Sequence, residues 1–357
     1  MKNFLLRPLP IFALLLLIIF SCKKPDKDYN VPSTYNFSIV NYSGQTQRLN
    51  MLEEMLNYMD MALTGNPINA TVLNEMFVNE NDQFVGSYSK DLRSKFYELD
   101  TNVILNLFDS IAQASISPSP GSNGTAGIVT SSSDPTKKYL FSSTGKQYSE
   151  QIEKMIMGAV FYYQATAVYM SEDQIGNAVN NETIVPGEGT AMEHHWDEAF
   201  GYWGVPLDFP GNLAGLRYFG EYTAQRNAYL KCSKPLMDAF ILGRSAISNK
   251  DMDTKNAQVP IIRSWWEKVV AACAIHYLNT AKTNIGDDAL RNHQLSEAWG
   301  FIYMLKYNPA KTISQTQIDA LIQNLGGNFY TINGSTIDSV RDQLSTIFQM
   351  DAIKSLL

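Results

Sequence analysis

Two short segments of the chain place a histidine and a glutamate four residues apart. The first segment holds His194 and Glu198, and the second holds His293 and Glu297. On a helix, residues at this spacing lie one turn apart on the same face. A neutral imidazole and a carboxylate so placed can share a metal ion, or the carboxylate can orient the imidazole by hydrogen bonding. A further histidine, His195, precedes Glu198 by three residues.

The same two segments belong to an internal repeat. "HHWDEAFGY" (194–202) aligns without gaps to "HQLSEAWGF" (293–301), and "EKMIMGAVFYY" (153–163) aligns to "EKVVAACAIHY" (267–277). Both matches occur in the same order, and the difference in length falls in the connecting loop. An internal duplication follows, which predicts two helix pairs related by a pseudo-two-fold axis.

Each copy also carries a glutamate at the start of its first matched segment, Glu153 and Glu267. If both helix pairs face one centre, these carboxylates converge with the two His/Glu pairs. Such a set resembles the carboxylate-bridged metal sites of helix bundles, and a divalent or ferric ion is the expected cofactor. The candidate ligands are His194, His195, Glu198, His293 and Glu297, with Glu153 and Glu267 as weaker candidates.

Plainer interpretations of these residues remain open. A Glu-Lys pair at a helix start is often solvated and favoured by the helix dipole. The His/Glu pairs can also serve only as hydrogen bonds inside the core. Asp197 lies off the face of His194 and Glu198 and is a candidate for the surface. Like His195, it has no counterpart in the second copy.

Other chemistry has no support in the sequence. The chain has no phosphate-binding glycine loop, no Gly-x-Ser-x-Gly, no Cys-x-x-Cys and no His-Glu-x-x-His. Without a recognised catalytic motif, an enzyme is the less favoured interpretation. The net charge is -7 and no Lys/Arg-rich run follows the N-terminus, which argues against a nucleic-acid partner.

The elements that position these residues are predicted to be helices. Apolar residues recur at helical spacing, and sustained strand alternation is absent, so the fold class is all-α. A small β-hairpin is possible near residues 126–142, inside a Ser/Pro/Gly-rich surface loop. The predicted helical segments are 47–63, 90–114, 147–170, 192–204, 230–248, 263–282, 292–307, 314–326 and 335–350.

The length and the 45% hydrophobic content allow one large or two medium cores. We expect a helical domain over 35–357, with a first bundle at about 45–210 and a second at about 220–357 forming one compact unit. Cys232 and Cys273 are expected as two buried thiols, although an exported protein could pair them.

The N-terminus has the features of an export signal. Lys2 and Arg7 precede an apolar run, Ile11–Phe20, and the following "IFSC" resembles a bacterial lipobox that ends in Cys22. Residues 1–21 are therefore predicted as a lipoprotein signal peptide and 22–34 as the lipidated cysteine and a flexible tether. A cleaved ordinary signal peptide is the alternative. Several acyl chains on one cysteine give stable anchoring. Lys23 favours the outer membrane, facing either the periplasm or the cell surface.

Several motifs together resemble a known family. These are "GKQYSEQIEKMIMGAVFYYQA", "HHWDEAFGYWGVP", "FILGRSAI", "WWEKVVAACAIHYLN" and "HQLSEAWGFIYML". They are similar to a family of exported lipoproteins of unknown function from Bacteroidetes-type bacteria, which is in turn similar to the imelysin-like proteins. The resemblance extends from about Tyr35 to the C-terminus.

The resemblance implies two pseudo-symmetric helical bundles, an association with iron uptake and a metal site at Gly-x-His-x-x-Glu. His195 and Glu198 match that motif, whereas Glu193 replaces its glycine. We expect an outer-membrane lipoprotein that binds a metal ion or small polar ligand without catalysing a reaction. The alternatives are an imelysin-like metallopeptidase and a structural or interaction lipoprotein.

Overall fold

The computed structural model describes residues 29–357. By its internal contacts the chain divides into Met1–Asn30 and Val31–Leu357, and the second unit is described here by itself. The predicted signal peptide (1–21) and Cys22 lie outside the described residues, as does the first part of the tether. Within the described part, no helix is both long and apolar enough to cross a membrane.

The second unit is all-α with one small hairpin, as predicted. Strands β1 (Gly127–Thr130) and β2 (Lys138–Phe141) pair antiparallel, with Gly127 opposite Phe141. The helices are α1 (Ser43–Asp60), η1 (Met61–Thr64), α2 (Ala70–Val78), η2 (Arg93–Lys95), η3 (Glu98–Asp100), α3 (Thr101–Ser115), α4 (Tyr148–Ile156), η4 (Met157–Tyr162), η5 (Gln164–Tyr169), α5 (Glu172–Ile175), α6 (Ala191–Gly201), α7 (Phe219–Leu230), α8 (Ser233–Ser248), α9 (Met252–Thr283), α10 (Asp288–Met304), η6 (Leu305–Tyr307), α11 (Gln315–Leu325), η7 (Phe329–Thr331) and α12 (Gly334–Ile347).

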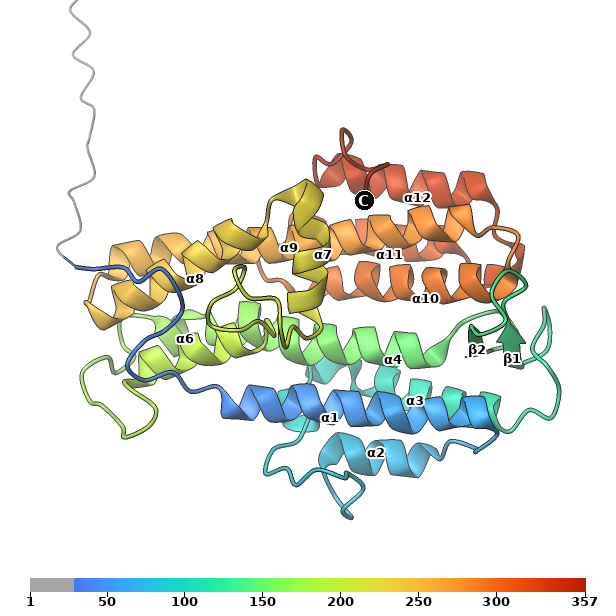
Figure 1. Ribbon diagram of the computed structural model, residues 1–357, viewed down its shortest axis with the longest axis horizontal. Coiled ribbons are helices and arrows are strands. Elements are labelled where there is room, and N and C mark those ends of the chain that lie inside the picture. Colours follow the sequence, from blue (N-terminus) through green and yellow to red (C-terminus); the bar gives the residue numbers. More distant parts are fainter. Residues whose placement is uncertain (1–28) are drawn as a thin grey trace, which may run out of the picture. The chain divides into compact units, whose positions relative to one another are not determined.

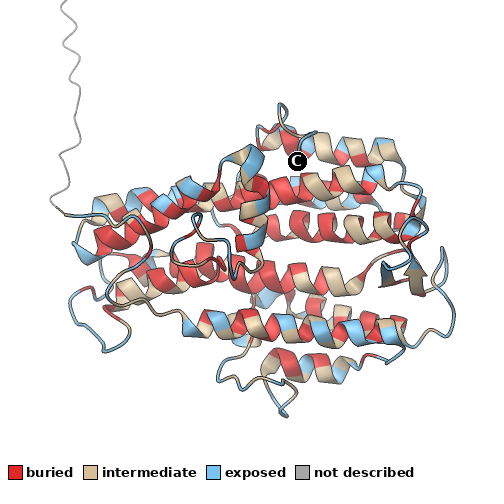
Figure 2. Cartoon of the chain, in the orientation of Figure 1, coloured by how far each residue is buried: buried red, intermediate tan, exposed pale blue. Residues whose placement is uncertain are grey.

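One continuous helix runs through the centre of this unit. It consists of α4 followed by the π-helical segments η4 and η5. Helices α1 and α3 pack on one side of it and α10 packs on the other (Figure 1). Its sequence is apolar nearly all round, which predicts a helix surrounded by others. Figure 2 shows it buried along most of its length, together with α9 and α10.

The second long helix, α9, begins earlier than the sequence predicts. Pro260 lies inside it, and a proline in a helix interior removes one hydrogen bond and costs about 3 kcal/mol. The sequence predicts a helix over 263–282, but the helix starts at Met252, with Asp251 as its N-cap. Packing of α8 and α10 along α9 offsets the cost of the proline.

The two matched segments of the repeat form helix pairs. In the second copy α10 packs against α9, which contains both the start and the end of segment 267–277, whereas in the first copy α6 packs against η5, which follows the matched segment 153–163 on the same continuous helix. The bundles expected at about 45–210 and 220–357 share one core, because α4 of the first packs directly on α10 of the second. Cys232 and Cys273 are free and buried, as predicted.

Glycines allow the closest helix contacts in both copies. The sequence places Gly201 and Gly300 at matching positions, where small residues are expected to admit a neighbouring helix. The structure confirms the close approach of a helix at Gly300, which faces Lys154 of α4, whereas Gly201 faces Tyr42, the residue before α1. A methyl group at Gly300 would lie 2.6 Å from Cγ of Lys154 and closer still to its Cβ. The contact between α4 and α10 therefore requires glycine at this position.

We predict that Gly300→Ala destabilises the protein. Overpacking of a tight contact costs about 1–3 kcal/mol, which exceeds the gain of about 1 kcal/mol that alanine brings to a helix. Chemical denaturation should show a lower free energy of unfolding. Gly286→Ala is the matched control, because nothing lies within 4 Å of the added carbon. Equal stability of Gly300→Ala and the wild type would contradict the prediction.

Candidate functional site

The first His/Glu pair lies on α6 and faces α1 and η5. His194 Nε2 is 3.9 Å from Glu198 Oε2, which is too far for a hydrogen bond. Glu198 Oε1 instead accepts hydrogen bonds from Gln45 Nε2 at 2.9 Å and from the Tyr169 hydroxyl at 3.0 Å. The carboxylate therefore ties three elements together, and it does not bond to its own histidine.

His195 turns toward a different element. Its Nδ1 lies 2.6 Å from the backbone oxygen of Gln174 in α5. Because a carbonyl oxygen only accepts, the ring donates from Nδ1. His195 thus holds the short helix α5 against α6.

Asp197 is fully buried, so the prediction that it lies at the surface is wrong. Arg244 of α8 donates from Nε to Asp197 Oδ1 at 2.9 Å, and the Tyr35 hydroxyl donates to the same oxygen at 2.7 Å. Burial raises the pKa of Asp197 to about 6, although Arg244 lowers it in part. The helical pattern of α6 could not reveal this role, because the countercharge comes from another helix.

The second pair, on α10, has different partners. His293 Nδ1 donates to Gln147 Oε1 at 2.8 Å, and the imidazole stacks on Tyr139 of β2 at 4.4 Å between ring centres. Glu297 Oε2 lies 3.0 Å from Lys154 Nζ. In this copy too, the glutamate pairs with a residue other than its own histidine.

The structure does not bring the two pairs together. Glu297 contacts Lys154, whereas Glu198 contacts Tyr169. Lys154 and Tyr169 lie on the same continuous helix, and fifteen residues at about 1.5 Å each put them about 20 Å apart. A single ion or small ligand cannot contact both pairs.

A buried lysine lies at the centre of the second group. Lys154 Nζ lies 2.7 Å from Glu153 Oε2, 3.0 Å from Glu297 Oε2 and 3.4 Å from Glu150 Oε2, and its side chain is 1% exposed. The rings of Tyr222 and Phe301 lie 5.6 and 5.7 Å from the same nitrogen. One ammonium group therefore faces three carboxyl groups in a mostly apolar setting.

Burial and mutual repulsion raise the pKa of all three carboxyl groups. The pKa of Glu153 rises to about 7, chiefly through burial and against the attraction of Lys154. The pKa values of Glu150 and Glu297 are raised for the same first reason. Burial alone would lower the pKa of Lys154, but the carboxylates hold it well above its usual value. Glu153 therefore takes up a proton near neutral pH.

A cavity of about 350 Å³ opens beside this cluster. Three carboxylates from three helices line it: Glu53 of α1, Glu153 of α4 and Glu221 of α7. The remaining lining residues are Leu56, Leu216, Arg217, Tyr218 and Tyr222. Arg217 Nη2 pairs with Glu53 at 2.7 Å. In the described part of the chain, no cationic side chain lies within ion-pair distance of Glu221. Glu153 joins the buried Lys154 cluster to the cavity.

A family model described as "Domain of unknown function (DUF4856)" matches residues 32–351. The chain belongs to this family. No curated protein and no solved structure matches the chain significantly. The DUF4856 match spans both copies of the repeat and the cavity-lining helices α1, α4 and α7. The resemblance to imelysin-like proteins stays a prediction.

The residues of this DUF4856 chain do not fit the expected metal ion. Within residues 29–357, no three His, Cys, Asp or Glu side chains are arranged to hold one. At the first pair, Gln45 and Tyr169 both donate to Glu198. At the second group, the Lys154 ammonium occupies the position between the carboxylates where an ion would lie.

Glu267, a weaker candidate, has a structural role. It is buried, and its two oxygens accept hydrogen bonds from the backbone nitrogen and the hydroxyl of Thr312, both at 2.7 Å. The residue therefore holds the loop before α11 against α9. The alternative interpretation, a solvated Glu-Lys pair at the start of a helix, therefore applies to neither Glu153 nor Glu267.

Sequence reasoning misses most of the cavity. The apolar spacing does not predict helix α7, so Glu221 and Tyr222 are not identified as candidate site residues. For Glu53, the spacing indicates only that the residue lies on a helix. One signal is present: Glu150, Glu153 and Lys154 share a face of an otherwise apolar helix. Charges on a helix that must be buried indicate a paired, functional cluster.

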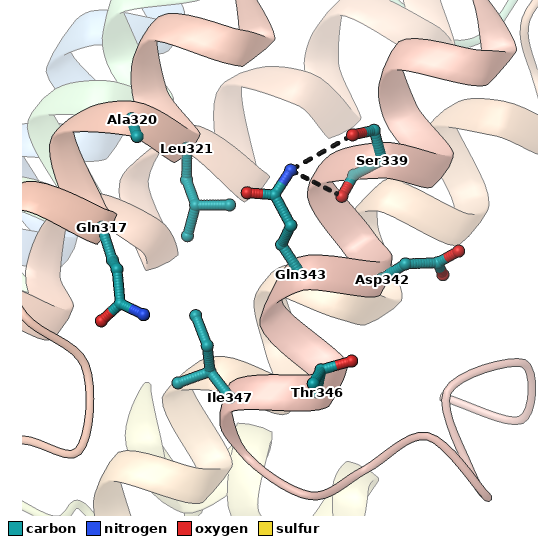
Figure 3. A pocket seen from close by; sticks show the side chains of 8 residues that line it. All are labelled: Gln317, Ala320, Leu321, Ser339, Asp342, Gln343, Thr346 and Ile347. Carbon is teal, nitrogen blue, oxygen red and sulfur yellow. Dashed lines mark hydrogen bonds between the residues drawn. The ribbon is translucent and has the colours of Figure 1, made fainter.

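Another cavity, of about 600 Å³, lies between α11 and α12 and contains none of the predicted residues (Figure 3). Gln343 Nε2 donates to the backbone and hydroxyl oxygens of Ser339 at its edge. Its one carboxylate, Asp342, already pairs with Arg341 and Lys354. The chemistry of this cavity is therefore limited to neutral polar and apolar contacts.

We predict that Lys154→Met destabilises the protein in a pH-dependent way. Removing one partner of a buried ion pair costs about 3–5 kcal/mol, because the remaining charges are uncompensated. Raised carboxyl pKa values mean that the folded state binds protons more tightly than the unfolded state. The loss should therefore be larger at pH 8 than at pH 5, where Glu153 is protonated.

Chemical denaturation at both pH values measures this effect. Lys234→Met is the control, because Lys234 pairs with Asp238 on the surface of α8 and such pairs contribute under about 1 kcal/mol. A loss in Lys154→Met no larger than in this control, or one that does not change with pH, would contradict the role of Lys154.

Proposed function

We propose that the protein is an exported, lipid-anchored, imelysin-like binding protein of the outer membrane, and that it holds a small organic cation in the cavity beside Glu153. The observation that carries the proposal is the convergence of Glu53, Glu153 and Glu221 on one cavity. The sequence has no recognised catalytic motif, so the proposal is one of binding alone.

Charge balance favours a cationic ligand. Glu53 is neutralised by Arg217, whereas Glu150, Glu153 and Glu297 share the single charge of Lys154. Burial raises the pKa of Glu221, and repulsion from Glu153 adds to the shift. A bound cation would relieve this repulsion and release protons from the carboxyl groups.

The rest of the lining favours an organic ammonium over a bare metal ion. Tyr218 and Tyr222 place aromatic rings beside the carboxylates, and Leu56 and Leu216 add apolar surface. Aromatic faces attract ammonium groups, and the Tyr222 ring already has the Lys154 ammonium near it. The volume suits a small molecule.

We predict that 1,4-diaminobutane binds to the purified protein in a saturable way and more tightly at pH 8 than at pH 6. The pKa of Glu153 of about 7 means that protonation competes with the ligand, and one such group gives about a tenfold difference in Kd. Isothermal titration calorimetry at both pH values measures it. Fe³⁺ and Zn²⁺ in parallel titrations test the metal-ion form of the proposal.

Glu153→Gln should weaken this binding and remove most of its pH dependence. The matched control is Glu80→Gln, the same change at an exposed residue outside the cavity. No binding of the diamine, or equal binding by wild type and Glu153→Gln, would reject the cation site. Tighter binding of a metal ion than of the diamine at Glu153 would replace the organic ligand with an ion.

We also predict that Cys22 carries the lipid anchor. The proposal rests on the basic residues Lys2 and Arg7, the apolar run Ile11–Phe20 and the lipobox-like "IFSC". The wild type should partition into detergent, and mass spectrometry of its N-terminal peptide should show acyl chains on Cys22. Cys22→Ser should leave the protein unacylated. A mature N-terminus with an unmodified Cys22 would contradict the anchor.

A further inference from the structure

A third cavity, of about 370 Å³, lies where the central helix ends. It is formed by the residues that follow η5, by α5 and by the first half of α9. Two cationic side chains of α9, Lys255 and Arg263, line it. Its other lining residues are Met170, Ser171, Glu172, Ile175, Asn256, Val259 and Pro260.

Both cations bond to backbone carbonyls. Lys255 Nζ donates to the oxygen of Ile175 and is almost wholly buried. Arg263 donates from Nε to the oxygen of Thr166 at 2.8 Å and from Nη2 to that of Met170 at 3.0 Å. Among residues 29–357, neither cation has a carboxylate within ion-pair distance. The other ammonium and guanidinium hydrogens remain available as donors.

The cavity therefore has an excess of positive charge. Its one carboxylate, Glu172, is exposed and acts on Lys255 only from a distance. Burial lowers the pKa of both Lys255 and Arg263, as expected for cations held away from water without a full countercharge. Backbone carbonyls carry only partial charges, so they satisfy hydrogen bonds without neutralising either side chain.

The wall formed by α9 adds further polar groups. The Asn256 and Ser171 side chains also line the space and can each donate a hydrogen bond. We propose that this cavity binds a small oxyanion, a carboxylate or a phosphate, through Lys255 and Arg263. The site is separate from the proposed cation site at Glu153.

Titration of the full chain with inorganic phosphate and with succinate tests the proposal and distinguishes the two oxyanions. We expect saturable binding of at least one of them in calorimetry. Asn256→Asp introduces a negative charge at an exposed lining position without removing either backbone cap. It should weaken binding about tenfold. Glu172→Gln removes the one carboxylate and should tighten binding.

Asn324→Asp, at an exposed position of α11, is the matched control and should bind as the wild type does. Glu153→Gln should likewise leave oxyanion binding unchanged, so that failure here is distinguishable from failure of the cation site. The proposal is overturned if neither probe binds. It is also overturned if Asn256→Asp and Glu172→Gln bind as the wild type does, since Lys255 and Arg263 would then serve only as helix caps.

Discussion

The pairing of the buried Lys154 ammonium group with carboxyl groups is the interaction on which the rest of the structure depends. The ammonium group lies beside the close contact between α4 and α10 that Gly300 makes possible, and it binds carboxyl groups from both helices. Without a cation at this point, three acidic side chains would face each other in the core. With it, they stay together and give Glu153 a carboxyl group that can exchange protons near neutral pH and that lines a cavity.

The fold was largely predictable because burial leaves a periodic pattern. The hairpin strands and the central helix follow from turn residues and apolar spacing alone. The start of α9 was missed because Pro260 is a local signal that packing overrides. Asp197 was misplaced for a related reason, since its partner Arg244 lies 47 residues away on another helix. Local patterns identify elements, but the partners of buried charges come from elsewhere in the chain.

The matched segments of the two predicted copies are helical in both, but they do not share their chemistry. Glu153 and Glu267 align in sequence, yet one binds Lys154 and the other binds Thr312. The two repeat glutamates Glu198 and Glu297 likewise meet unrelated partners. Matching residues were expected to form one site because they match, but the residues around them had diverged. Matching segments in a sequence are therefore weak evidence for a shared site.

The dipole of the central helix helps to explain why the cavity beside Glu153 is acidic and the cavity beside Lys255 and Arg263 is basic. A helix carries partial positive charge at its N-terminus and partial negative charge at its C-terminus. Glu150 and Glu153 lie in its first two turns, and Lys255 and Arg263 cluster beyond its last turn, where Arg263 bonds directly to the carbonyls of Thr166 and Met170. The same dipole thus stabilises acidic groups at one end and basic groups at the other. Because its terminal charges are only partial, they do not neutralise the charged side chains at either end.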